Sequence, residues 1–79
     1  MGYDHYAAAR GLADRLAAEG QRAWAEKLVR VMAEGATGTE IFMGLRWRLQ
    51  QLERLGDSLS DGTKERIGAL LKELDAALR

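Results

Sequence analysis

Glycines, and no prolines, interrupt the hydrophobic pattern of this chain of 79 residues. Gly20, Gly35 and Gly56 separate stretches that are each long enough for a helix of three or more turns. Glycine often follows the last residue of a helix because it adopts left-handed backbone angles without strain. No stretch shows the sustained period-two alternation of a half-buried strand. The chain is therefore predicted to form a single all-α domain over residues 1–79, a compact antiparallel bundle of three to four helices.

Four segments carry apolar residues at spacings of three and four. They run from about Asp4 to Glu19, from about Gln21 to Glu34, from Thr37 to about Leu55, and from Ser60 or Asp61 onward. Such spacing places the apolar residues on one side of a helix. The predicted inward residues are Tyr6, Ala9, Leu12, Ala13 and Leu16, then Trp24, Leu28, Val31 and Met32, then Ile41, Leu45, Leu49 and Leu52, and finally Ile67, Leu70, Leu71, Leu74 and Leu78.

Two turns carry local signals for the start of a helix. Thr37-Gly38-Thr39-Glu40 is a T-x-x-E capping box, in which the hydroxyl and the carboxylate each satisfy a free backbone N–H. Ser60 or Asp61 is predicted to cap the last helix, and Leu59 to close one end of the bundle. Gly44 lies inside the third helix, where a glycine costs about 1 kcal/mol relative to alanine.

The composition excludes several classes of function. The chain has no cysteine and one histidine, so no disulfide, thiolate zinc site or cysteine nucleophile can form. We expect no catalytic residue, no cofactor and no metal site, and hence no enzyme. Asp57 and Asp61 resemble the start of a calcium loop, but Leu59 and Gly68 stand where ligands are required. Twelve basic and twelve acidic residues give no net charge, so binding to nucleic acid is not expected.

The longest apolar runs are too short to span a bilayer, and the first residues lack the pattern of a secretory signal. We therefore expect a cytoplasmic protein without membrane association. Tyr3, Asp4, His5 and Tyr6 are the one place where a general base and hydroxyls occur together. They project over more than half of the helix circumference, so we expect them not to converge on one pocket and to have a structural or surface role.

A second face of the third helix carries the candidate partner-binding residues. Met43, Trp47, Gln50 and Arg54 project away from the predicted core stripe. A tryptophan with arginine neighbours has the composition of an interface hot spot. Two interpretations remain open: this side packs on the first or fourth helix, or it is exposed and binds another molecule.

The sequence Arg46-Trp47-Arg48 also suggests a small helix-turn-helix DNA-binding regulator. A recognition helix reads bases with residues near its start, where this helix has Glu40, which phosphates would repel. The alternative is that the two arginines are solvated or paired with carboxylates. Glu53 and the carboxylates of the first helix are the predicted partners of Arg46.

From Leu28 onward the order of features resembles a known class of protein. An apolar helix ends at Glu34-Gly35, Glu40-Ile41 begins a leucine-rich helix, and Leu59-Ser60 precedes a last helix of Ile67 to Leu78. This pattern, over about two-thirds of the chain, resembles the small helical immunity proteins of bacterial polymorphic toxin systems, in particular the MafI-like ones. The resemblance implies a non-catalytic inhibitor that binds a cognate toxin domain and blocks it.

The sequence thus predicts a protein-binding module. The more specific hypothesis is an immunity-type toxin inhibitor. The alternative is a helical module that forms a homodimer through the Met43 and Trp47 side or through the apolar stripe of the fourth helix. Both hypotheses require an apolar helix face to be buried against another chain.

Overall fold

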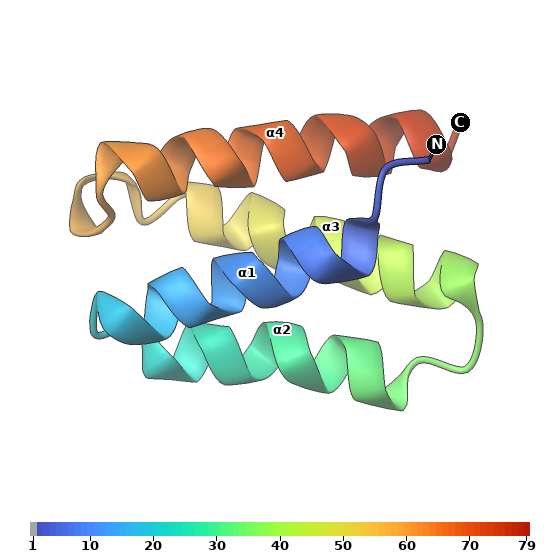
Figure 1. Cartoon of the computed structure of the whole chain (residues 1–79), viewed down its shortest axis with the longest axis horizontal. Helices are drawn as coiled ribbons and strands as arrows, with labels where there is room; N and C mark the ends of the chain where they lie inside the picture. The colour runs from blue at the N-terminus through green and yellow to red at the C-terminus, as the bar shows by residue number, and fades with distance from the viewer. Residues whose placement is uncertain (1) are drawn as a thin grey trace.

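The protein is a four-helix bundle, seen in a computed structural model that describes residues 2–79 (Figure 1). The helices are α1 (His5–Ala18), α2 (Arg22–Glu34), α3 (Gly38–Glu53) and α4 (Asp61–Ala77), with a short 3-10 turn, η1 (Gly56–Ser58), before α4. No strand occurs within residues 2–79. The predicted all-α antiparallel bundle is confirmed, and it has four helices.

Successive helices run antiparallel and form a ring. α1 packs on α2 and α4, and α3 packs on the same two helices from the other side of the core. The connections are short, so each helix lies beside the one before it and the two chain ends lie at the same end of the bundle (Figure 1). The bundle measures 30 × 23 × 22 Å.

The core consists of one apolar stripe from each helix. Ala9 and Ala13 keep α1 close to its neighbours, while leucines fill most of the remaining space. Leu59 is also buried and closes one end of the bundle, as predicted. Some predicted inward residues lie at the edge of the core and are only partly buried: Tyr6, Trp24, Val31, Met32, Ile41 and Leu78. The fully or nearly buried ones are Ala9, Leu12, Ala13, Leu16, Leu28, Leu45, Leu49, Leu52, Ile67, Leu70, Leu71 and Leu74.

Side-chain caps begin three of the helices, and at the start of α1 the Asp4 carboxylate accepts the N–H of Ala7 at 2.9 Å. The hydroxyl of Thr37 accepts the N–H of Glu40 at 3.1 Å, and the carboxylate of Glu40 accepts the N–H of Ala36 at 3.3 Å. Ser60 accepts the N–H of Thr63 at 3.3 Å and caps α4. The predicted caps at Thr37 and Ser60 are confirmed, although the Glu40 carboxylate binds the amide one residue before the one that a capping box uses.

Glycines bring α2 and α3 close together. Gly20 and Gly56 have the positive φ angles expected after a helix, 85° and 49°, but Gly35 has a φ of −68°. A Cβ atom at Gly35 would overlap the side chain of Ile41, so close packing and not backbone conformation requires glycine there. At Gly44, a Cβ atom would lie 2.9 Å from Cγ1 of Val31 on α2. The interior glycine of α3 therefore lets the two helices approach.

Candidate functional site

The four candidate residues form one outward stripe along α3 and its C-cap residue, Arg54. Met43, Trp47, Gln50 and Arg54 are all exposed, Met43 at 51% and Trp47 at 53%. The interpretation that this side packs on the first or fourth helix is therefore wrong. Leucines fill the inward side of α3, and its flanks already contact α2 and α4. We call these four residues the α3 face.

Arg48 lies against the ring of Trp47. Its guanidinium carbon is 4.7 Å from the centroid of the indole ring. A cation at this distance is attracted to the negative charge density on the ring face. About half of Trp47 remains exposed to solvent. A tryptophan side chain has only two torsion angles, so a partner can bury its large ring with a small loss of conformational entropy.

Arg46 pairs with a carboxylate that the sequence did not indicate. Its Nη1 lies 3.5 Å from Oδ1 of Asp75 on α4, and both side chains are partly exposed. The predicted pairing with Glu53 or with a carboxylate of the first helix is wrong. α4 runs antiparallel to α3, so its last turns lie beside the first half of α3, and α1 lies across the core. Of the two arginines that suggested DNA binding, one pairs with a carboxylate and the other lies against Trp47.

The side chains near the N-terminus form a row of ring contacts. The ring of His5 lies 4.9 Å from that of Tyr3 and 4.4 Å from that of Phe42, measured between centroids, and Tyr6 lies 5.7 Å from Phe42. Nε2 of His5 is 3.3 Å from the backbone oxygen of Glu73. Burial, helped by the charge of Glu73, raises the pKa of Tyr3 above 10.0. His5 and Tyr6 both contact Phe42 of α3, and Tyr3 contacts His5, so these rings fasten the start of α1 to α3 and α4.

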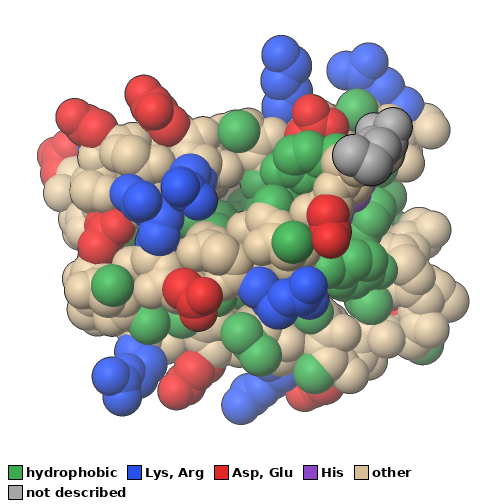
Figure 2. All heavy atoms as spheres, in the orientation of Figure 1, with side chains coloured by type: hydrophobic (Ala, Val, Ile, Leu, Met, Phe, Trp, Pro, Cys, Tyr) green, Lys and Arg blue, Asp and Glu red, His purple; other side chains and the backbone are tan. Residues whose placement is uncertain are grey.

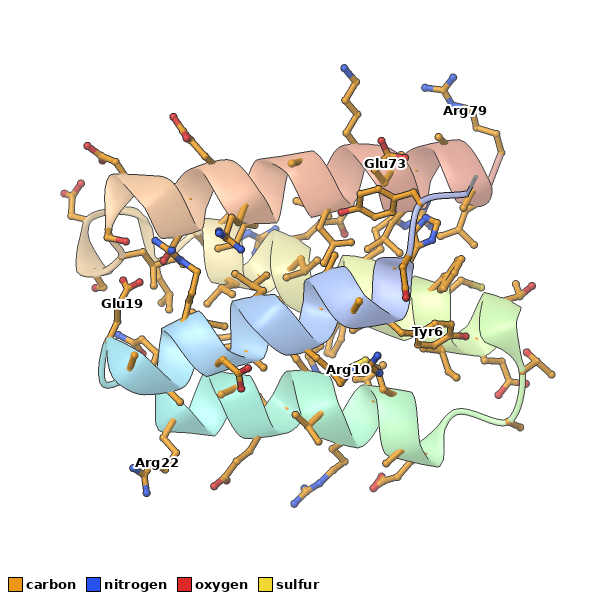
Figure 3. The ribbon with its side chains drawn as sticks, viewed as in Figure 1. Tyr6, Arg10, Glu19, Arg22, Glu73 and Arg79 are labelled. Carbon is orange, nitrogen blue, oxygen red and sulfur yellow. The ribbon has the colours of Figure 1, made fainter. Side chains whose placement is uncertain are left out.

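A polar network that the sequence did not predict joins the other end of α1 to α4. Glu19 points toward the start of α4 (Figure 3). Its carboxylate accepts hydrogen bonds from the N–H of Ser60 at 2.9 Å, from the Ser60 hydroxyl at 3.0 Å and from the hydroxyl of Thr63. Nε of Arg15 donates to the Thr63 hydroxyl at 3.3 Å. The bonds from Thr63 and Ser60 lower the pKa of Glu19 below its ordinary value of 4.5.

A shallow groove of about 550 Å³ runs between α1 and α2. It is lined by small apolar residues and edged by charged ones, and this front face of the molecule shows hydrophobic side chains among acidic and basic ones (Figure 2). The apolar lining residues are Ala13, Ala17, Ala25, Val29 and Ala33, and the charged ones are Asp14, Arg22, Glu26, Arg30 and Glu34. Alanine occurs both in cores and on surfaces, so the alanines in the sequence did not indicate this groove. The one available signal for it was the regular spacing of charges on α2.

The apolar stripe of α4 does not provide a free surface. Ile67, Leu70, Leu71 and Leu74 are buried in the core. The alternative of a homodimer through this stripe is therefore wrong, because the folded chain already covers it. Among the residues that the structure describes, no helix is both long and apolar enough to cross a membrane. Within residues 2–79, no three acidic or histidine side chains lie together in a way that could hold a metal ion.

Comparison of the chain with protein-family models, with curated proteins and with solved structures finds no match. The assignment of the candidate site is therefore based on its geometry alone.

Proposed function

We propose that this chain is a non-catalytic protein-binding module that contacts its partner through the α3 face. The observation that carries the proposal is the exposure of Trp47 and Met43, one turn apart on the outer side of α3. Large apolar side chains are usually buried, and an exposed pair beside polar groups is typical of a binding surface.

The composition of the α3 face suits a small interface. Tryptophan and arginine are the residues most often found at the centres of protein interfaces, where the ring supplies area and the guanidinium supplies directed hydrogen bonds. Arg54 and Gln50 continue the stripe with donors that remain exposed. Arg46 and Asp75 lie beside it as a partly exposed ion pair and supply a polar rim.

The backbone under the α3 face is rigid. The opposite side of the same helix carries Leu45, Leu49 and Leu52, all fully buried, so the helix cannot move without disrupting the core. A partner therefore meets a preformed surface, and binding does not require the chain to fold.

The sharper form of the proposal is an immunity-type inhibitor that acts in the cytoplasm by covering a toxin domain. The order of helices and turns from Leu28 onward supports it through the resemblance to MafI-like immunity proteins. The balanced charge argues that such an inhibitor would act by covering the toxin rather than by imitating nucleic acid.

The test is recovery of a partner from nuclease-treated lysate of the source organism, with the wild type and Trp47→Asp compared. We expect one toxin-like protein at equal stoichiometry with the wild type and its loss with the variant. Lys72→Asp on α4 is the matched control, because it places the same residue at another exposed helical position. A partner that binds Trp47→Asp as well as the wild type would show that the α3 face is not the binding surface.

A further inference from the structure

The outer side of α2 carries a row of alternating charges. Arg22, Glu26, Arg30 and Glu34 follow one another at intervals of four residues, so they lie along one side of the helix. All four are exposed and all four edge the groove between α1 and α2. Figure 3 shows Arg22 pointing away from the bundle. This row and Val29 together are called the α2 face.

The row is complementary to a second copy of itself that runs in the opposite direction, because each arginine then lies opposite a glutamate. If a second copy lies antiparallel on α2 with its two-fold axis at position 28, Arg22 faces Glu34 of the other copy and Glu26 faces Arg30. Each of the four contacts then joins opposite charges. A parallel two-fold pair is necessarily in register, so it would place every charge opposite its equal and is unfavourable. The row thus favours one orientation of one partner, a second copy related by a two-fold axis.

Apolar surface lies beside that axis. Val29 is 50% exposed and is one residue from the midpoint of the row, so the two copies of its side chain would meet near the axis. The small residues Ala17 and Ala33 line the groove next to it and leave room for a neighbouring side chain. Helices pack when the side-chain ridges of one fit into the grooves of the other, and Val29 of one copy is placed to enter the groove of the other.

The charges of the row are available for new contacts. Nε of Arg30 lies 3.9 Å from Oε1 of Glu34 in the same chain, and the two side chains are 73% and 65% exposed. An ion pair that is long and exposed is weak. Both residues can therefore turn to the other copy, and partial burial beside Val29 would strengthen the new contacts.

We propose that a second copy of this chain docks on the α2 face in an antiparallel, two-fold symmetric dimer. The α3 face lies on a different helix from the α2 face, and its residues are not part of the proposed docking surface. The inference does not depend on the function proposed for the α3 face.

Charge reversal provides the test. Glu26→Lys places a lysine opposite Arg30 of the other copy, and Arg30→Glu places two glutamates together, in each case at two symmetric positions. We expect sedimentation equilibrium to show a monomer–dimer equilibrium for the wild type and an association weakened by about tenfold or more in each variant. Mixed in equal amounts, the two variants restore opposite charges at both positions. A mixed dimer should therefore form at the protein concentration at which the wild type dimerises.

Recovery in the mixture also shows that both variants are folded, and circular dichroism of each variant alone checks this directly. The double variant Glu26→Lys with Arg30→Glu should again form a dimer with itself. Lys72→Glu on α4 is the control for a charge change away from the α2 face and should leave association unchanged. A wild type that stays monomeric at its highest soluble concentration overturns the proposal. So does a dimer that both single reversals leave intact, or one that Trp47→Asp alone removes.

Discussion

The carboxylate of Glu19, at the end of α1, accepts the backbone N–H of Ser60, at the start of α4, at 2.9 Å. In a capping box, a glutamate or glutamine three residues after the cap makes this bond from within the same helix. Here that position is occupied by Thr63, which is fully buried and donates its own hydroxyl proton to Glu19. A residue from another helix therefore completes the cap of α4 and fastens α1 to α4.

The pKa of Glu19 predicts how stability depends on pH. Because the pKa is lowered in the folded state, the ionised carboxylate stabilises the fold fully at pH values above its ordinary pKa of 4.5. This contribution is lost as the pH falls from that value through the lowered pKa. We expect Glu19→Gln to lower the melting temperature at pH 7. The difference in melting temperature between the variant and the wild type should become smaller as the pH falls.

Thermal melts between neutral pH and about pH 3 measure this effect by circular dichroism. Glu65→Gln, at an exposed position of α4, is the control. Its melting temperature should differ from that of the wild type by a nearly constant amount over the same pH range. A Glu19→Gln variant whose difference from the wild type stayed constant or grew on acidification would contradict the assignment.

Gly44 and Gly68 should respond in opposite ways to the same substitution. Both lie inside helices, where alanine is ordinarily better than glycine by about 0.5–1 kcal/mol. A Cβ at Gly68 meets nothing within 4 Å, so Gly68→Ala should stabilise the fold by that amount. At Gly44 the new atom crowds Val31 on α2, so we expect Gly44→Ala to destabilise by about 1–3 kcal/mol.

Urea denaturation of the two variants measures these free energies. Adding Val31→Ala to Gly44→Ala removes the crowded methyl groups, and the double variant should lose less stability than the two single changes added together. Stabilisation by Gly44→Ala alone would show that α2 and α3 can move apart without loss.

Trp47 and Leu49 are two residues apart on α3 and should differ sharply in their effect on stability. Trp47 is about half exposed, and Leu49 is fully buried. We expect Trp47→Asp to lower the free energy of unfolding by no more than about 1 kcal/mol, because the side chain is exposed. Part of that loss comes from the lower helix propensity of aspartate. Leu49→Ala should cost about 2–5 kcal/mol through the cavity that it leaves.

Chemical denaturation of the free protein, followed by circular dichroism, compares the two variants. If Trp47→Asp unfolded the isolated chain, the α3 face would be part of the core and could not serve as a binding surface. If both variants kept their stability, the assignment of the core stripe on α3 would fail.

Local patterns in the sequence were enough to predict the helices and the core. The spacing of Leu45, Leu49 and Leu52 identified the buried side of α3, and Thr37 and Ser60 marked two helix starts, because periodicity and caps depend on residues close together in the chain. The same periodicity placed Met43 and Trp47 off the core stripe, and so predicted the candidate α3 face.

What the sequence determined by itself is therefore the set of four amphipathic helices and the residues that each turns inward. Tertiary structure decided which outer surfaces stay exposed and which distant groups meet: Asp75 beside Arg46, Glu19 on Ser60, and the groove between α1 and α2. Periodicity specifies the inward side of a helix but not its neighbour. A contact between residues of different helices exists only once the order and direction of the helices around the core are set.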